Sequence, residues 1–253
     1  MRRIEVIGLE GIPEVKVGDD VARLIYEAFG RAGLQLKDGD IIVVAHKIVS
    51  KAEGRIVKLS DVKPSREALR ISKLTGKNPK IVELALRDSS SIVKALRGHL
   101  ITETRHGWFY SCSGVDLSNV SGGGSALLLP IDPDRSAREI RLKLEELSGS
   151  KLAVIISDTS GRPLRRGDID VALGVSGIRP ILDLRGRRDH YGYTLRLKQV
   201  ALADELASAA ELVMGQCDEW TPVALIRGYI FERDEESDSR SLKRSRSKDI
   251  FLR

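Results

Sequence analysis

One short stretch near the middle of the sequence is unusually dense in residues that could do chemistry. It places Asp158 beside Thr159 and follows them with Arg162, Arg165 and Arg166. A carboxylate and a hydroxyl can hold a hard cation such as magnesium, and arginines can clamp phosphate or carboxylate oxygens. The alternative is that the acid and hydroxyl form a turn after a strand and that the arginines face solvent.

Two other places in the chain offer oxygen ligands of the same kind, Asp116 with Asn119 and Gln216 with Asp218. Oxygen-only ligands favour magnesium, manganese or calcium over zinc. The surrounding lysines and arginines suit phosphoryl transfer, although the sequence has no P-loop, no kinase glycine loop, no dinucleotide fingerprint and no nucleophile elbow. The residues alone therefore predict metal-assisted chemistry on an anionic substrate.

The elements that must position these residues follow from the hydrophobic pattern. Continuous apolar runs over 41–44 and 152–156 are too short for helices and predict buried strands, which leaves Asp158 in the loop after the second run. Further strands are expected over 3–9, 91–112 and 222–230. Helices are expected over 19–33, 64–86 with a break at Gly76, 132–147 and 197–214.

Length and composition bound the class of protein. A chain of 253 residues can form one large domain or two smaller ones. The sequence has no apolar run of about 18 residues, so no membrane span is expected, and its start does not resemble a signal peptide. Two cysteines, Cys112 and Cys217, give no disulfide framework, which indicates the cytoplasm. We expect one unit over 1–231, divisible into two subdomains, and a charged tail over 232–253.

The charge balance leaves a nucleic-acid partner as an alternative. The net charge is +6 and the isoelectric point is about 9.3. Aromatic residues make up only 4% of the chain, which leaves few rings on which bases could stack. A modestly basic protein suits anionic small molecules at least as well as DNA. A nucleic-acid-binding protein that uses its tail is therefore the competing hypothesis from another class.

A set of motifs in a fixed order resembles one known family, that of the coenzyme F-420 γ-glutamyl ligases. The similarity extends from about Ile4 to Tyr229, so that it covers nearly the whole chain. The motifs that carry it are Gly11-Ile12-Pro13-Glu14, Ile48-Val49-Ser50-Lys51, Gly114-Val115-Asp116-Leu117-Ser118-Asn119-Val120, Leu128-Leu129-Pro130-Ile131-Asp132-Pro133-Asp134, Asp158-Thr159-Ser160-Gly161-Arg162-Pro163-Leu164-Arg165-Arg166-Gly167, Asp183-Leu184-Arg185-Gly186, Ala203-Asp204-Glu205-Leu206-Ala207 and Met214-Gly215-Gln216.

The resemblance implies a fold and a reaction. The fold would be a mixed α/β (α+β) arrangement of sheets flanked by helices, seen in the family as an intertwined homodimer. GTP would phosphorylate a carboxylate of the deazaflavin coenzyme precursor, and the amino group of L-glutamate would displace phosphate from the acyl phosphate to form an amide. The protein then needs no covalent nucleophile of its own, so no catalytic residue is assigned.

The resemblance also implies site residues and cofactors. Asp116 and Asp158 would hold one divalent ion, and Thr159 and Gln216 would hold a second, each ion being magnesium or manganese; potassium is a further candidate. The residues expected to bind GTP are Ile12, Pro13, Glu14, Val15, His46, Lys47, Lys51, Asn119, Met214, Gly215, Gln216, Cys217, Asp218, Glu219, Trp220 and Thr221. By spacing alone, Arg162, Arg165 and Arg166 are candidates for substrate phosphate or carboxylate.

The sequence departs from the family pattern in places. It has Ala45-His46-Lys47 where serine or threonine is common, and Tyr193 where arginine is common. A related metal-dependent amide ligase that uses another carboxylate acceptor is therefore the nearest alternative.

Overall fold

The computed structural model describes residues 1, 3–120 and 124–244 and divides the chain into two compact units. Unit 1 comprises Met1–Val15, Asp19–Ile48 and Asp132–Leu242. Unit 2 comprises Lys16–Gly18, Val49–Ile131 and the residues from Lys243 onward. The helices and strands of unit 1 are β1 (Glu5–Leu9), α1 (Val21–Arg31), β2 (Ile41–Ala45), α5 (Pro133–Ser148), β8 (Ala153–Gly161), β9 (Asp168–Ser176), β10 (Leu182–Asp183), β11 (Gln199–Val200), α6 (Leu202–Met214), β12 (Val223–Arg227) and the 3₁₀ turn η3 (Ser239–Leu242).

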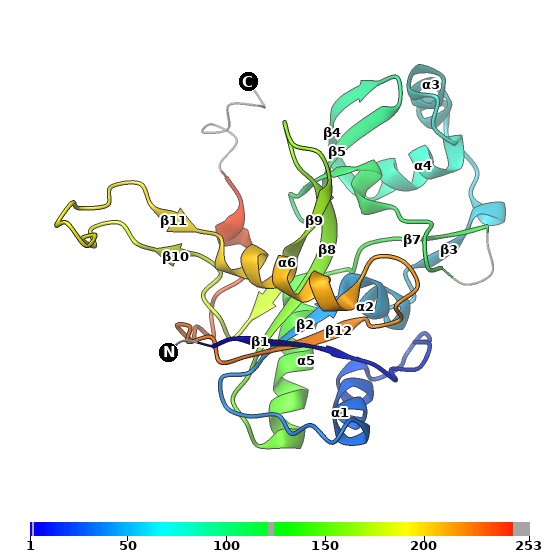
Figure 1. The fold of residues 1–253 in the computed structure, drawn as a ribbon. Helices are drawn as coiled ribbons and strands as arrows, with labels where there is room; N and C mark the ends of the chain where they lie inside the picture. Colours follow the sequence, from blue (N-terminus) through cyan, green and yellow to red (C-terminus); the bar gives the residue numbers. More distant parts are fainter. Residues whose placement is uncertain (2, 121–123, 245–253) are drawn as a thin grey trace. The chain divides into compact units, whose positions relative to one another are not determined.

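The centre of unit 1 is a five-stranded sheet in the order β1-β12-β2-β8-β9 (Figure 1). Strands β2 and β8 pair in parallel, and the other neighbours pair antiparallel. Residues 41–44 of β2 and 153–156 of β8 are completely or almost completely buried. Side chains alternate between the faces of a sheet, so both faces of this sheet are covered.

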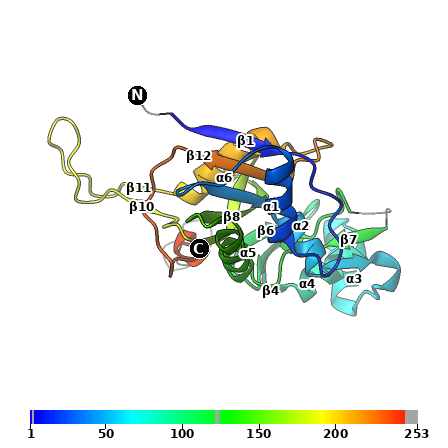
Figure 2. The same cartoon turned by 90° about the horizontal axis from the view of Figure 1, so that it is seen from below.

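Helices supply the cover on each face. Helix α6 packs its buried side against one face, where Leu206, Ala207 and Ala210 share one buried cluster with the strand residues Val43 and Ile155. Helix α5 packs against β8 and β9 and contacts α1 on the opposite face (Figure 2). The helices and the two faces of the sheet together form the core of unit 1, and this packing holds the strands in place.

Local sequence signals explain where these helices begin. Asp20 accepts a hydrogen bond from the backbone N–H of Arg23 and caps α1, and Asp132 caps α5 in the same way through Arg135. Pro133 occupies the first turn of α5, where its missing N–H costs nothing. Both starting points agree with the sequence prediction.

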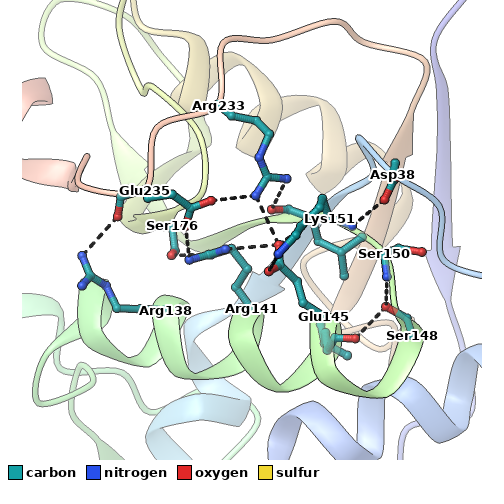
Figure 3. A network of polar contacts seen from close by, with 12 residues as sticks. Asp38, Arg138, Arg141, Glu145, Ser148, Ser150, Lys151, Ser176, Arg233 and Glu235 are labelled. Atoms are coloured by element: carbon teal, nitrogen blue, oxygen red, sulfur yellow. Dashed lines mark hydrogen bonds and ion pairs between the residues drawn. The ribbon is translucent and has the colours of Figure 1, made fainter.

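An ionic network centred on the buried Arg141 and Glu145 joins the segment after β12 to α5 (Figure 3). Arg141 is 3% exposed; its guanidinium lies 3.1 Å from Glu145 and donates to Ser176 at 2.9 Å. Arg233 and Glu235 reach the same cluster from residues 232–244, with Arg233 contacting Glu145 and Glu235 contacting Arg141. The start of the segment expected to be a charged tail therefore belongs to the packed part of unit 1.

Unit 2 has its own core. Its elements are β3 (Ile56–Lys58), η1 (Leu59–Asp61), α3 (Arg66–Thr75), α4 (Pro79–Arg87), β4 (Ser89–Leu96), β5 (His99–Thr104), β6 (Phe109–Ser111), η2 (Cys112–Gly114) and β7 (Ser125–Leu127), and α2 (His46–Ala52) begins in unit 1 and ends in unit 2. Strands β4, β5 and β6 form one antiparallel sheet, and β3 pairs with β7. Ile71, Leu84, Leu100 and Ala126 pack together in its buried cluster.

The mixed α/β class expected from the resemblance is confirmed, but two local predictions are wrong. The strand through 152–156 does not end before Asp158, because β8 continues to Gly161 in a hairpin with β9. The helix expected from Leu197 begins at Leu202, since Gln199 and Val200 pair with β10 instead. Part of the glycine-rich run, 121–123, lies outside the described residues. Within the described ranges, no helix combines the length and apolarity needed to cross a membrane.

Candidate functional site

The parallel pairing of β2 and β8 brings the first two candidate residues together. Ala45, the last residue of β2, is the register partner of Ser157, so the residues that follow them in the chain, His46 and Asp158, also come side by side. Nε2 of His46 lies 3.1 Å from Oδ1 of Asp158. The imidazole is 2% exposed and the carboxylate 12% exposed, so this contact is largely shielded from solvent.

The β8–β9 hairpin adds a second cluster, centred on Asp170. Thr159 is the register partner of Asp170, and its Oγ1 lies 3.1 Å from Oδ1 of that acid. Ser157 donates its hydroxyl to Oδ2 of Asp170 at 2.9 Å. Because side chains alternate along a strand, Asp158 projects to the opposite face of the hairpin from Ser157 and Thr159. The two metal-ligand pairs expected from the resemblance therefore begin on different faces of β8.

The C-terminal end of α6 completes the Asp170 cluster. Gly215 follows the helix with φ of 71°, and Gln216 comes directly after it. The Nε2 of Gln216 donates to Oδ1 of Asp170 at 2.9 Å, and its Oε1 accepts the Thr159 hydroxyl at 2.8 Å. Thr159 and Gln216, separated by 57 residues, are thus in direct contact, and their expected shared role as metal ligands stays a prediction.

The pKa of Asp170 is affected mainly by the burial of its carboxyl group. The residue is 5% exposed, and burial raises the pKa of its carboxyl above the ordinary value. Hydrogen bonds from Ser157, Thr159 and Gln216 act in the opposite direction, and the nearby charge of Asp158 raises the pKa further. The backbone of Asp170 is also fixed, since Ser208 of α6 donates to its carbonyl at 2.7 Å.

The segment after Gln216 forms a tight loop around a carboxylate. Glu219 accepts the backbone N–H of Cys217 at 2.8 Å, and this bond, with the other amides of the loop, lowers the pKa of the Glu219 carboxyl. A Cβ on Gly215 would lie 2.1 Å from the Glu219 side chain, so only glycine allows this approach. Converging backbone amides of this kind are a common setting for an anion.

Two distant segments expected to bind GTP also meet within unit 1. The indole Nε1 of Trp220 donates to the backbone carbonyl of Ile12 at 3.2 Å. Ile12 is buried, whereas Trp220 is 57% exposed. The turn after β1 and the loop after α6 therefore lie side by side.

The remaining predicted residues fall into two groups. Asp116, Asn119 and Lys51 belong to unit 2, where Oδ1 of Asp116 accepts the backbone N–H and the hydroxyl of Ser118 at 2.7 and 2.9 Å. Their expected roles stay predictions. Lys47 belongs to unit 1, in the first turn of α2.

The candidate arginines lie at the tip of the β8–β9 hairpin, beyond the Gly161–Asp168 pair. Arg162 donates to the backbone carbonyl of Arg166 at 2.9 Å and so braces the turn. Arg165 and Arg166 are exposed. Their expected contact with substrate stays a prediction.

The donor set suits a hard divalent cation better than a soft one. Within the described residues, no group of three or more histidine, cysteine, aspartate and glutamate side chains could hold a metal ion. The oxygens of Thr159 and Gln216 face each other at 2.8 Å, and the carboxylate of Asp158 is partly exposed. Such hydroxyl, amide and carboxylate oxygens match the preferences of magnesium and manganese. Of the two cysteines, Cys112 is buried and Cys217 is exposed, and they form no disulfide in the described part of the chain.

Sequence reasoning did not identify Asp170 or Ser157. Asp170 lies 11 residues beyond Thr159, and only the hairpin register brings the two together. A usable signal was present, because polar side chains alternate at Ser157 and Thr159 on one strand and at Asp168 and Asp170 on the next. Recognising both segments as paired strands would have placed these polar side chains next to one another on one face of the hairpin.

Comparisons with known proteins agree on one family. Residues 11–228 match the family model described as F420-0:Gamma-glutamyl ligase. A protein of Methanothermobacter thermautotrophicus called "Coenzyme F420:L-glutamate ligase" is 50% identical over 249 residues, which cover 98% of each chain. Proteins of the same name from Methanocaldococcus jannaschii and Archaeoglobus fulgidus are 43% and 37% identical, and each alignment covers 99% of this chain and 97% of the relative.

Proposed function

This chain belongs to the F420-0:Gamma-glutamyl ligase family, and we propose that it joins L-glutamate to the coenzyme F420 precursor by an amide bond at the expense of GTP. The observation that carries the proposal is full-length similarity, at 37–50% identity, to several proteins named coenzyme F420:L-glutamate ligase. The residues gathered after β2, within β8 and after α6 support a site for anionic reactants in unit 1.

The reaction proposed has two steps. A carboxylate oxygen of the precursor attacks the γ-phosphorus of GTP, the bond to the bridging oxygen breaks, and GDP leaves. The deprotonated amine of L-glutamate then attacks the acyl carbon, phosphate departs with its bonding electrons, and the proton lost by the nitrogen goes to the phosphate. The enzyme would align and neutralise anions in both steps and form no covalent bond itself.

A divalent cation, magnesium or manganese, would supply positive charge to the phosphate oxygens when bound. Asp158 would hold one ion together with Asp116, and Thr159 with Gln216 would hold another. The contact between Thr159 and Gln216, and the oxygen chemistry of all four side chains, support this assignment. His46 would keep the Asp158 carboxylate in one orientation through their 3.1 Å contact.

The nucleotide would lie against the turn after β1 and the loop after α6. The hydrogen bond from Trp220 to Ile12 joins these two segments, and backbone amides converge in the loop at Cys217. Glu219 occupies those amides with its own carboxylate, so a phosphate that used them would have to displace it.

We also propose a cytoplasmic homodimer. Two exposed apolar features of unit 1 support a partner surface. Leu212 on α6 is 82% exposed, and the β10–β11 hairpin extends away from the sheet of unit 1 with Tyr191 and Leu197 at least 90% exposed (Figure 1). Solvent-exposed side chains of this size are typical of interfaces when they cluster. Sedimentation of the wild-type chain and of Leu212→Glu would test this proposal, and a dimer that dissociates in the variant is expected.

The test of the ligase proposal is a coupled assay with product analysis. The protein is mixed with GTP, manganese or magnesium, L-glutamate and the unglutamylated deazaflavin coenzyme, with and without potassium. Release of GDP and phosphate is followed, and the mass of the coenzyme is measured by mass spectrometry. A mass gain of one or more glutamyl units that is lost in Asp158→Ala is expected.

Other outcomes would redirect the assignment. GTP turnover only with a different carboxylate acceptor would keep an amide ligase and reject this substrate. No turnover with any acceptor, together with tight and salt-sensitive binding of DNA or RNA, would replace the enzyme by a nucleic-acid-binding protein.

A further inference from the structure

Asp170 is a buried acid that the proposed reaction does not use directly. Three side-chain groups that can donate, from Ser157, Thr159 and Gln216, lie within 2.9 to 3.1 Å of its two carboxylate oxygens. Its side chain is buried behind Thr159 and Gln216, and the contact between those two residues is itself open to solvent. Asp170 therefore contacts Thr159 and Gln216 from the buried side, while these two residues face solvent.

The carboxylate restricts how the Gln216 amide can be turned. Both oxygens of Asp170 accept hydrogen bonds, one from Ser157 and one from Gln216, and an amide group has one donor end and one acceptor end. The Nε2 of Gln216 must therefore point to Asp170, which leaves Oε1 on the side of Thr159. The reversed amide would place Oε1 against Oδ1 of Asp170, with two acceptors in contact and no hydrogen between them.

The carboxylate of Asp170 can also accept the hydroxyl hydrogen of Thr159. The hydroxyl has one hydrogen and two acceptors in reach, Oδ1 of Asp170 at 3.1 Å and Oε1 of Gln216 at 2.8 Å. When the hydrogen points to Asp170, the Thr159 oxygen and the Gln216 oxygen both have lone pairs free on the outward side. Two adjacent oxygens with free lone pairs are what a hard cation binds.

We propose that Asp170 is a positioning residue that turns Thr159 and Gln216 into an oxygen pair for a divalent cation. It does so by holding the amide nitrogen and the hydroxyl hydrogen on its own side. The inference rests on the proposed function for the assignment of an ion to Thr159 and Gln216. Hydrogen bonds from behind commonly set the orientation of metal ligands, and their loss typically costs about 10- to 100-fold in metal affinity.

The experiment measures binding of Mn²⁺ to the full chain by electron paramagnetic resonance, with and without GDP. Asp170→Ala should weaken one class of bound Mn²⁺ about tenfold or more. Asp204→Ala is the matched control, since Asp204 also contacts β9 through the backbone N–H of Ala172 and also has its pKa raised by burial. Asp204→Ala should bind Mn²⁺ like the wild type.

A double variant separates positioning from general damage. If Asp170 acts through Gln216, then Gln216→Ala alone should remove most of the effect, and adding Asp170→Ala should change Mn²⁺ affinity little further. Fully additive losses would overturn the inference.

A second substitution tests the inference if Asp170→Ala does not fold. Asp170→Asn keeps the volume of the side chain. Its amide satisfies either orientation of Gln216, so its affinity should lie between those of the wild type and Asp170→Ala, and equality with Asp204→Asn would overturn the inference.

The outcomes distinguish this inference from the proposed function. Glutamylation by the wild type, with unchanged Mn²⁺ binding in Asp170→Ala, leaves the ligase intact and rejects the positioning role. Selective loss of Mn²⁺ in Asp170→Ala, without glutamylation by the wild type, supports the positioning role and rejects the substrate. A wild type that binds no Mn²⁺ under either condition overturns the inference directly.

Discussion

His46, directly after β2, faces Asp158 in the parallel neighbour β8, with 3.1 Å between the imidazole Nε2 and the carboxylate Oδ1. The relationship follows from one register, that of Ala45 with Ser157. Because His46 is 2% exposed and Asp158 is 12% exposed, the sheet sets the geometry of their contact and solvent has little access to it.

The first prediction concerns this pair. His46→Ala should lower kcat/KM of glutamylation about tenfold, because Asp158 loses the contact that orients its carboxylate. His46→Gln, whose amide nitrogen can replace Nε2, should recover part of the loss. Steady-state kinetics of the two variants provide the measurement. His99→Ala, at an exposed position on β5, is the control and should behave as wild type. Equal kinetics for His46→Ala and His99→Ala would reject the role of the contact.

The second prediction concerns the buried network on α5. Arg141→Ala should destabilise the fold by about 3 kcal/mol, because Glu145, 8% exposed, loses a buried partner. Arg135→Ala removes an exposed pair with Glu139 on the same helix and should cost at most about 0.5 kcal/mol. Urea unfolding of both variants measures the difference. Similar midpoints for the two variants would show that the network contributes little stability.

The third prediction compares two glycines. A Cβ at Gly174 would lie 2.3 Å from the backbone of Pro133, so Gly174→Ala should force α5 away from β9 and cost about 1–3 kcal/mol. Gly30 lies within α1 and would place its Cβ in open space, so Gly30→Ala should stabilise the fold by up to about 1 kcal/mol. Thermal unfolding should move in opposite directions for the two variants. A shift of the same sign in both would contradict the packing described for α5.

The fourth prediction is a pH dependence. Burial raises the pKa of Asp204 above 3.8, so the folded chain binds this proton more tightly than the unfolded chain. The stability contributed by Asp204 is therefore complete below the unfolded pKa and is lost as the pH rises through the folded pKa. In Asp204→Asn this dependence is absent. The stability of the wild type relative to this variant should fall over that window and then level off, and urea unfolding from about pH 3.5 to about pH 7 measures it. A difference that does not change with pH would contradict the raised pKa.

The sequence was most informative where one local pattern decided the outcome. The apolar runs in β2 and β8 and the aspartates that cap α1 and α5 act within a few residues, so these elements could be predicted. The hairpin of β8 and β9 could not be predicted in the same way. Polar residues from Ser157 onward interrupt the apolar run, although the pairing with β9 continues as far as Gly161. Pairing across a sheet depends on the partner strand, and a local apolar pattern contains no information about that partner.

The candidate site shows the same division. Asp158, Thr159 and Gln216 were named from the sequence because they lie in motifs that resemble a family. Asp170 was not named, because its role depends on a register with Thr159 and on Gln216, which lies just after helix α6 and 46 residues further along the chain. A residue whose partners are set by tertiary structure becomes visible only once the strands are paired.

Three residues after β12, Arg233, Glu235 and Ser239, bind side chains of α5 and so determine where this chain can be shortened. Arg233 and Glu235 complete the network of Arg141, and Ser239 donates to the partly buried Asp134 through both its N–H and its hydroxyl. A truncation placed at residue 232 would remove these partners and expose charged groups of α5. An experiment on the basic terminal segment should therefore keep residues 232–244, so that loss of nucleic-acid contact or of activity can be separated from loss of the fold.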